Sequence, residues 1–536
     1  MNTMIEVPAL SDIGFANFAN KAWRPHQAEV VQKIAGSKSR VVLVQAPTGA
    51  GKSPIALSAA KLSEPKRNRA YRDNRKYPPQ SAVLTVTKQL QQQYLRDFSD
   101  YAQEVKGRGN YPCLVEPTVT ADDAPCTVPS KDAGRCEVQN TCPYFVQRDK
   151  ALNAPASIHN YAYFLNSTNY SGFFSQQSLL VLDEGHLLDD ALMSFISSKI
   201  VVSVCAKFDI EPPCQIENEN VPAYEIWSAW ARRQLPRLKD RLEDIEELRS
   251  LDVGLRRLYR AGSNLLTSLH RLATSKEPWI CEPLISRGQQ VGWEFKPVWI
   301  GSLADEYLYQ HAERTAILSA TILDPDIFCS IIGVPDAEYI ELPSTFPVGR
   351  KPVYFDPAWY GKYGSDTSGL VKRIVEIIRE NKGFKGLVHC VSYALVNAIV
   401  AAAPPDVKAR IMTHTSADRN QVFEEYLART DDPVLLSPSM KEGVDLPGDL
   451  CRFIIIAKLP YPSLGSPQIK ARMNTSLGDR WYQWKTTCDL LQMTGRGMRS
   501  ADDWCKVYIL DGAFARLFQR MRYCLPKWWT DDLKGI

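Results

Sequence analysis

The sequence of 536 residues predicts an α/β protein with two parallel-sheet domains and two insertions in the first domain. In both halves of the chain, short apolar runs rich in β-branched residues alternate with helical patterns, which is typical of a doubly wound sheet. In addition, residues 41–62 show the strand, loop and helix order of a nucleotide-binding unit. A single core stops growing at roughly 250 to 300 residues, so this chain should hold several domains.

The first predicted strand, 41–44, runs directly into a loop that fits the P-loop pattern, with Ala replacing the first Gly. This loop consists of Ala46, Pro47, Thr48, Gly49, Ala50, Gly51, Lys52 and Ser53. The glycines let the backbone N–H groups face a triphosphate, Lys52 would reach its β and γ phosphates, and Ser53 would hold Mg²⁺. The helix after the loop would direct its N-terminus at the same phosphates. The alternative is an ordinary glycine-rich turn, but the required order of strand, Gly-Lys-Ser and helix favours nucleotide binding.

Two polar segments flank this unit. Before it, the stretch WRPHQ at 23–27 opens a short amphipathic helix, and Gln27 is placed to hydrogen-bond an adenine edge, although such a helix start is common. After it, the basic run at 64–79 is best interpreted as a solvated loop, with a DNA-backbone contact or a targeting patch as alternatives. A second strand, 81–87, and a helix, 88–98, then continue the α/β pattern.

The α/β pattern breaks between residues 106 and 150, in a polar segment with little apolar periodicity. Its four cysteines are Cys113, Cys126, Cys136 and Cys142. Such a segment cannot build a core of its own, and a metal centre would tie its loops together. The spacing lacks the two C-x2-C knuckles usual in zinc ribbons, while a last Cys followed by Pro also occurs in ferredoxin-type cluster binding. Spacing alone therefore leaves iron–sulfur and zinc open, and both fit better than four free thiols.

The next strand, 178–182, ends in Asp183-Glu184-Gly185-His186. Carboxylates at the carboxyl end of a parallel strand lie beside the crevice where ligands bind in such sheets. We expect Asp183 to hold Mg²⁺ and Glu184 to orient and deprotonate the attacking water. A surface acidic pair is the alternative, and the apolar residues directly before the pair disfavour it.

Residues 201–289 change to a helical character. Leucines and isoleucines recur there at intervals of three and four, for example at Leu238, Leu242, Leu265 and Leu269, which predicts an inserted helical domain that packs on itself. Trp227 and Trp230 are interpreted as core residues of that domain before base-stacking groups. A strand at 315–321 then closes the first half with Ser-Ala-Thr.

The second half repeats the α/β pattern. Buried strands are predicted at 386–391, 434–440, 453–463 and 507–511. Gly443 and Asp445 follow one strand in the stretch EGVD, and QMTGRGMR is predicted to lie on a helix. Arg496 and Arg499 are three residues apart, hence on one face of that helix, where two guanidinium groups could meet a γ-phosphate. Two surface arginines are the alternative, but Gln492 and Gly495 at matching positions favour the functional interpretation.

Composition sets broad limits. The net charge of +4 is modest, so any basic groove must be local, and no run approaches the ~18 apolar residues of a membrane span. The first residues lack the basic and apolar regions of a secretory signal. We therefore expect a reducing, intracellular setting without membrane association, where 13 cysteines do not form a disulfide framework.

With the P-loop, DEGH, SAT, EGVD and QMTGRGMR in this order, the chain resembles superfamily 2 helicases over nearly its whole length. The four cysteines lie between the first two nucleotide motifs, introduced by GRGNYPC and closed by CPYF, as in the XPD/DinG family of iron–sulfur DNA helicases. The stretches STFPVGRKP at 344–352 and KLPYPS at 458–463 are also similar to connecting segments of that family.

The resemblance implies two RecA-like parallel-sheet motor domains, with an iron–sulfur cluster insertion and a helical arch insertion in the first. The implied boundaries are 1–106, 151–200 and 290–335 for motor domain 1, 107–150 for the cluster domain, 201–289 for the arch and 336–536 for motor domain 2.

The resemblance also assigns roles to residues. Arg24 and Gln27 would lie near the base, His186 would link the ATP site to motor movement, and Gly443 and Asp445 would sense nucleotide across the cleft. Gln492, Arg496 and Arg499 would complete the catalytic site, with Arg499 as the arginine finger. Cys113, Cys126, Cys136 and Cys142 would ligate a [4Fe-4S] cluster, which favours iron–sulfur over zinc. DEGH departs from the common DEAH without changing the ligands, and the chain is short for the family.

The implied function is an ATP-dependent helicase that moves 5′ to 3′ on single-stranded DNA and unwinds forked duplexes, with RNA–DNA hybrids as a further substrate. Tyr144, Phe145, Tyr161 and Tyr163 are candidate stacking groups, and packing is the equal alternative. A monomeric motor, bacterial or viral and nucleoid-associated, is expected in the cytoplasm, or in the nucleus of a eukaryote. The alternative function is a DNA-stimulated ATPase that remodels nucleoprotein as a subunit of a larger complex, with little unwinding of its own.

Overall fold

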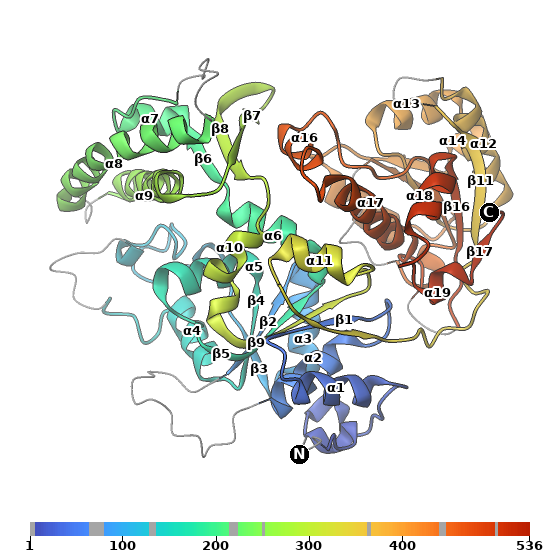
Figure 1. The fold of residues 1–536 in the computed structure, drawn as a ribbon, viewed down its shortest axis with the longest axis horizontal. Helices are drawn as coiled ribbons and strands as arrows, with labels where there is room; N and C mark the ends of the chain where they lie inside the picture. Colours follow the sequence, from blue (N-terminus) through green and yellow to red (C-terminus); the bar gives the residue numbers. More distant parts are fainter. Residues whose placement is uncertain are drawn as a thin grey trace.

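The structure is a computed structural model of the chain. It describes residues 6–63, 80–127, 136–213, 223–248, 252–361, 366–438, 446–498 and 502–536. Two α/β domains lie side by side and a third, mostly helical part projects from the first (Figure 1). None of the helices in these ranges is both long enough and apolar enough to cross a membrane.

Motor domain 1 is built on a seven-stranded sheet in the order β10-β1-β9-β5-β2-β4-β3, in which every pair is parallel. Its strands are β1 (Val41–Gln45), β2 (Ser81–Thr85), β3 (Ala102–Glu104), β4 (Ala156–Asn160), β5 (Gln177–Asp183), β9 (Ala312–Ser319) and β10 (Glu338–Glu341). Every residue of β1 and β5 is buried, as expected for central parallel strands with helices on both faces.

Alternate side chains of β1 enter two separate cores. Val42 and Val44 pack with the helices of one face, α1 (Gln27–Gly36), α2 (Lys52–Leu62) and α3 (Lys88–Phe98). Val41 and Leu43 pack with those of the other face, α4 (Pro143–Asn153), α5 (Tyr161–Asn166), α6 (Leu188–Ile196), α10 (Gly301–Tyr307) and α11 (Pro325–Ile332). This two-sided burial confirms the predicted doubly wound domain.

Motor domain 2 has a second seven-stranded parallel sheet in the order β13-β14-β12-β15-β16-β11-β17. Its strands are β11 (Val353–Trp359), β12 (Gly386–His389), β13 (Ile411–Thr413), β14 (Val434–Ser437), β15 (Phe453–Ile456), β16 (Lys506–Asp511) and β17 (Leu533–Lys534). Its helices are α12 (Ser368–Glu380), α13 (Tyr393–Ala402), α14 (Pro405–Lys408), α15 (Arg419–Ala428), α16 (Pro467–Met473), α17 (Gly478–Thr494), α18 (Ala513–Met521) and α19 (Lys527–Thr530). The prediction of two parallel-sheet domains is thus confirmed.

The inserted part after α6 contains α7 (Val202–Lys207), α8 (Ala223–Leu248) and α9 (Val253–Thr274). Leu238, Leu242, Leu265 and Leu269 are buried, and Trp227 packs against Phe295, so the predicted self-packing core is present.

The same insertion holds a small antiparallel sheet that the sequence analysis did not predict. Its strands are β6 (Ser198–Val201), β7 (Trp279–Ser286) and β8 (Gln289–Pro297), in the order β6-β8-β7. Arg287 and Gly288 connect β7 to β8, and both have positive φ, as a tight type I′ hairpin turn requires. The boundary predicted at residue 289 falls at the start of β8, the strand that pairs with both β6 and β7.

Candidate active site

The predicted nucleotide motifs follow neighbouring strands. β9 lies between β1 and β5 in the sheet, and all three run parallel. The P-loop follows β1, Asp183 ends β5 and Ser319 ends β9. Because carboxyl ends of parallel strands meet at one edge, these motifs converge although they are far apart in the chain.

Lys52 and Glu184 form an ion pair at this edge. The Nζ atom of Lys52 lies 2.8 Å from Oε1 of Glu184 and 3.9 Å from Oδ1 of Asp183. Burial, the largest single effect, acts to raise the pKa of Glu184, but the positively charged groups around it, Lys52 first, together lower this pKa to about 2. Glu184 is therefore ionised at neutral pH, and the predicted phosphate-binding Lys52 is paired with the predicted catalytic carboxylate.

Asp183 is almost fully buried and accepts two hydrogen bonds. Its Oδ1 atom accepts one from the backbone N–H of Glu184 (2.9 Å), and its Oδ2 atom accepts one from the hydroxyl of Tyr94 (3.0 Å). Burial raises the pKa of Asp183 in spite of Lys52. Tyr94, on α3, was not among the predicted site residues, because a tyrosine within a helix carries no motif.

The P-loop has the conformation that its glycines permit. Gly49 and Gly51 have φ values of 81° and 78°, a region that other residues rarely adopt. A Cβ atom on Gly51 would lie 2.4 Å from Nε2 of Gln27. Ser53 is buried in the first turn of α2. The loop thus needs glycine at position 51 for both backbone conformation and space.

Arg24 and Gln27 lie against the P-loop. The Nε2 atom of Gln27 donates to the carbonyl of Ala50 (2.7 Å), and its Oε1 atom accepts from the backbone N–H of Arg24 (2.9 Å). The guanidinium of Arg24 donates to the carbonyl of Gly49. These two residues therefore brace the loop, and both also line the cavity described next.

A cavity of about 810 Å³ opens beside these residues, and both motor domains line it. Its wall includes Arg24, Gln27, Thr48, Gly49, Gly51, Lys52, Ser53, Asp183, Glu184 and His186 of motor domain 1, and Gln492 and Arg496 of motor domain 2. Phe18 and Lys21 also line it and were not predicted, because no motif marks them. The volume is within the range of small-ligand sites.

His186 connects the acidic motif to motor domain 2. Its Nδ1 atom lies 3.0 Å from Oγ of Ser319 and 3.4 Å from Nε2 of Gln492. The same Gln492 amide donates to the hydroxyl of Thr321 (3.0 Å). Burial lowers the pKa of His186 to about 3 although Glu184 acts in the opposite direction, so the ring is neutral at neutral pH.

The predicted helical position of Arg496 is wrong. Helix α17 ends at Thr494, and residues 495–497 form a turn, because the two glycines of GRG favour a helix end over continuation. Arg496 still reaches the cavity, and its positive charge helps Lys52 to lower the pKa of Glu184. Arg499, Gly443 and Asp445 lie outside the described residues.

The four predicted cluster cysteines belong to one irregular segment between β3 and α4. Sγ of Cys113 accepts the backbone N–H of Glu116 (3.4 Å), and Sγ of Cys126 accepts Nη1 of Arg108 (3.7 Å). Burial raises the pKa of Cys126, and the nearby Cys136 and Cys142 add to that effect. In the described part of the chain, however, no three metal-binding side chains converge closely enough to hold an ion. The donors suit a sulfur-ligated group, although the thiols do not form a closed site.

Three arginines of α9 hold this segment against the arch. The ion pairs are Arg256 with Glu116, Arg257 with Asp123, and Arg260 with Asp122 and Asp123. Tyr144, Phe145 and Tyr161 are buried, which supports packing over base stacking for these three candidates.

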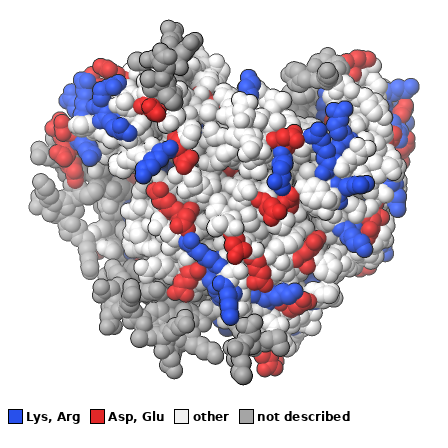
Figure 2. All heavy atoms as spheres, viewed as in Figure 1, with Lys and Arg blue, Asp and Glu red and all other residues white. Residues whose placement is uncertain are grey.

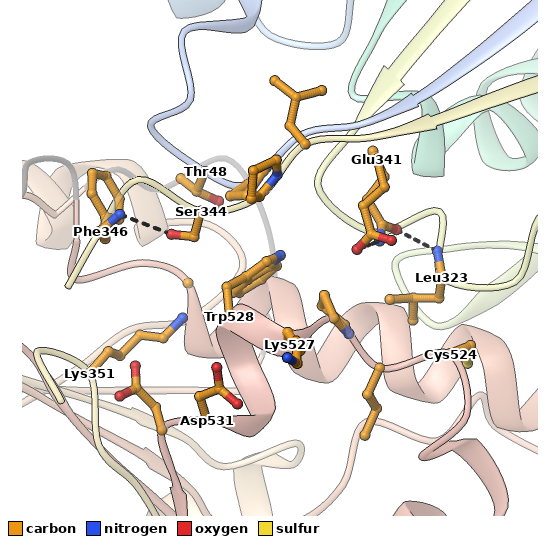
Figure 3. Close-up of a pocket in the computed structure, with 18 of the residues that line it drawn as sticks. Thr48, Leu323, Glu341, Ser344, Phe346, Lys351, Cys524, Lys527, Trp528 and Asp531 are labelled. Atoms are coloured by element: carbon orange, nitrogen blue, oxygen red, sulfur yellow. Dashed lines mark hydrogen bonds between the residues drawn. The ribbon is translucent and has the colours of Figure 1, made fainter. Parts of the chain in front are cut away.

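A second cavity, of about 890 Å³, shares Thr48 with the first and also lies between the motor domains. Figure 3 shows Trp528, from the C-terminal α19, projecting into it between Thr48, Lys351 and Lys527. The neighbouring Trp529 is fully buried and donates to the hydroxyl of Thr494 (3.0 Å). The C-terminal segment is thus fixed to the helix that precedes Arg496.

Comparison with known proteins agrees with this arrangement. Residues 24–204 match the DEAD/DEAH box helicase family, and residues 374–532 match the helicase C-terminal domain family. The "ATP-dependent DNA helicase YoaA" of Escherichia coli K12 is 21% identical, with 90% of each chain covered. This chain is an XPD/DinG-like superfamily 2 helicase.

The further relatives and solved structures that are similar to this helicase carry the names DinG and XPD. The "ATP-dependent DNA helicase DinG" of Photobacterium profundum is 25% identical over 41% of this helicase and 34% of its own length. Among solved structures, "XPD_Helicase" superposes with a TM-score of 0.62 at 14% identity, covering 93% of this helicase and 97% of that chain. The "Structure of S. tokodaii Xpd4" gives 0.57, with 95% and 99% covered. The fold of this helicase is therefore that of the XPD structures.

Proposed function

We propose that this protein is an ATP-dependent DNA helicase that translocates 5′ to 3′ on a single strand and unwinds forked duplexes. The observation that carries the proposal is the shared cavity, in which Lys52 and Glu184 of one motor domain face Arg496 of the other. A site divided between two domains is completed only when they close, which is how nucleotide binding produces movement.

In the proposed mechanism, the triphosphate of ATP displaces Glu184 from Lys52. Lys52 would then bind the β and γ phosphates, and Ser53 and Asp183 are the residues that would hold Mg²⁺. The released Glu184 orients the attacking water and accepts its proton. Asp183 is already held by Tyr94 and by the Glu184 N–H, so its carboxylate needs little reorganisation to receive the metal.

Domain closure would bring Arg496 and Arg499 to the γ-phosphate, where positive charge stabilises the transition state. Gly443 and Asp445 would respond to the nucleotide from the same domain. The neutral His186 lies between Ser319 and Gln492. A change in the position of Glu184 would therefore be transmitted through His186 and Gln492 to motor domain 2. Hydrolysis and phosphate release would reopen the cleft, and each cycle would advance the strand.

The DNA strand would run over both motor domains and past the arch. Figure 2 shows a notch between the arch and motor domain 2, with Lys and Arg side chains on the lobes that border it. Such side chains suit contacts with DNA phosphates. We propose that Cys113, Cys126, Cys136 and Cys142 hold a [4Fe-4S] cluster, which would fix the cluster segment where the duplex separates.

The test is strand displacement by anaerobically purified protein on matched duplexes with a 5′ or a 3′ single-stranded tail, with Lys52→Ala as the control. We expect ATP-dependent unwinding of the 5′-tailed duplex only, and loss of unwinding in the control. Hydrolysis of ATP without unwinding of either duplex would contradict the helicase proposal and favour the nucleoprotein-remodelling ATPase. Unwinding from the 3′ tail would contradict the proposed direction.

A further inference from the structure

Arg472, on α16 of motor domain 2, is a buried cation whose side-chain hydrogen bonds go to motor domain 1. Its Nη1 and Nη2 atoms donate to the two carboxylate oxygens of Asp189, at 2.7 and 3.0 Å. Its Nε atom donates to the carbonyl of Val298 at 2.8 Å. The side chain of Arg472 is 5% exposed and that of Asp189 is 13% exposed.

Two tryptophans enclose this guanidinium. The Cζ atom of Arg472 lies 4.5 Å from the ring centroid of Trp299 and 4.8 Å from that of Trp481. The two rings meet edge to face at 5.6 Å and 86°. Flat aromatic faces and a bidentate carboxylate suit the planar guanidinium and not the compact ammonium of lysine. Arginine is therefore specifically required at this position.

The partners of Arg472 belong to two functional parts of motor domain 1. Asp189 lies in the first turn of α6, three residues after His186 of the acidic motif. Val298 directly follows β8, the strand by which the arch returns to motor domain 1. One side chain of motor domain 2 is thus bonded both to the segment next to the ATP site and to the base of the arch.

Helix α16 makes a second set of contacts with the arch sheet. Oε1 of Glu282, on β7, accepts from the Ser466 hydroxyl (2.8 Å) and from the Gln468 N–H (3.1 Å). The side-chain amide of Gln468 donates to the carbonyl of Pro297 (3.1 Å). The N-terminus of α16 is therefore fixed to the arch, and its C-terminal half is fixed to α6.

We propose that Arg472 is a positioning residue that couples ATP-driven movement of motor domain 2 to the arch through Asp189 and Val298. The proposal rests on the proposed function, because it assumes a motor that acts on DNA. When nucleotide changes the distance between the domains, α16 moves with motor domain 2 and carries α6 and the base of the arch with it. Without Arg472, ATP would still be bound and hydrolysed, but the arch would not follow.

The test compares Arg472→Lys and Asp189→Asn with the wild type. The matched control is Arg520→Ala, which breaks the exposed pair of Arg520 with Asp479, 3.4 Å apart within motor domain 2. For each protein we would measure thermal unfolding, the KM and kcat for ATP with and without single-stranded DNA, and ATP molecules hydrolysed per base pair unwound.

We expect both test variants to remain folded, with a KM for ATP within about twofold of wild type and DNA-independent ATP hydrolysis retained. ATP consumed per base pair should rise about tenfold, which corresponds to a lost interaction of ordinary strength. Arg520→Ala should match the wild type. A purely structural role would instead lower hydrolysis and unwinding in the same proportion, and that result, or a wild-type coupling ratio in Arg472→Lys, would overturn the proposal.

Failure of the proposed function is distinguishable from failure of this inference. If the wild type hydrolyses ATP without unwinding, the helicase proposal fails, and coupling is then measured as the stimulation of ATP hydrolysis by single-stranded DNA. Loss of that stimulation in Arg472→Lys, with DNA-independent hydrolysis retained, would still support the inference, and unchanged stimulation would overturn it.

Discussion

Individual residues of the cavity shared by the two motor domains are bonded to one another or to the P-loop. Lys52 is paired with Glu184, and Arg24 and Gln27 are bonded to carbonyl groups of the P-loop. The motifs and the family resemblance mark these residues, but they do not identify their partners, because each charged group pairs with the opposite charge that the complete fold brings nearest to it.

Replacing Glu184 with Gln should separate ATP binding from hydrolysis. Loss of the general base should lower kcat by about 10²- to 10⁴-fold. At the same time, ATP should bind more tightly, because Lys52 no longer has to leave an ionised partner. Turnover and the binding of a fluorescent ATP analogue would measure both effects, with Glu29→Gln, an exposed carboxylate on α1, as control. Near-normal hydrolysis in Glu184→Gln would exclude Glu184 as the base.

His159 should make the stability of motor domain 1 depend on pH. Its ring is fully buried between Tyr163 and Phe174, and burial lowers its pKa from 6.5 to about 3. Between those values the unfolded chain binds a proton that the folded chain does not. The free energy of unfolding should therefore fall as pH decreases below 6.5, by about 1.4 kcal/mol per pH unit.

His159→Phe would remove this contribution while keeping an aromatic ring in the same aromatic pocket. The shift of the unfolding temperature between pH 7.5 and pH 5 should be smaller in this variant than in the wild type. The buried His186 should contribute a similar pH dependence in both proteins. Equal shifts in His159→Phe and wild type would contradict the assignment.

At the scale of elements, the strands were more predictable than the segments that join them. β1 and β5 are continuous apolar runs because they are covered on both faces, and such runs are visible in a sequence. The β7–β8 hairpin was missed because Arg287 gives no sign of its positive φ. The end of α17 was missed because Gln492, Arg496 and Arg499 were placed on one continuous helix, and the glycines between them were not interpreted as a helix end.

The turn after α17 provides a sharp comparison between two glycines. A Cβ atom at Gly497 would lie 2.5 Å from Sγ of Cys505 and 2.9 Å from the carbonyl of Cys451, whereas at Gly495 the nearest atom is 3.3 Å away. Gly497→Ala should cost about 1–3 kcal/mol of stability, as overpacking does, and should displace Arg496 and reduce ATP hydrolysis. Gly495→Ala should have a smaller effect on both. Thermal unfolding and steady-state hydrolysis would measure the pair, and similar values for the two variants would refute this account of the turn.

At the scale of the whole molecule, the chain order of the motifs was sufficient to predict two parallel-sheet domains. It could not predict which charged residues pair across the domains, since Arg472 and Asp189 are 283 residues apart and nothing in either neighbourhood identifies the other. The ion pairs between α9 and the cysteine segment belong to the same class of contact. Long-range pairing depends on the complete fold, and one sequence contains many equivalent arginines.

Cys113→Ser should abolish strand separation while leaving ATP hydrolysis largely intact. Removing one thiol of the proposed cluster should reduce bound iron and abolish strand separation, because the loops of the cysteine segment would no longer be tied together. ATP hydrolysis should be largely retained, since the shared cavity contains none of these cysteines. Iron content, hydrolysis and strand displacement would be measured together, with Cys329→Ser on α11 as the control. Wild-type unwinding by Cys113→Ser would disprove this role.

The pairing of β6 with β8 has a consequence for how the arch could be exchanged. The chain leaves motor domain 1 through β6 and returns through β8, and Ser198 lies opposite Phe295 in that antiparallel pair. The strand by which the chain enters the arch and the strand by which it leaves are therefore adjacent and hydrogen-bonded to each other. The described arch helices, α7, α8 and α9, all lie between these two strands in the chain. A tight turn that joins β6 directly to β8 would leave the central sheet of motor domain 1 unchanged. An insertion of different size or chemistry could therefore replace the arch at this point.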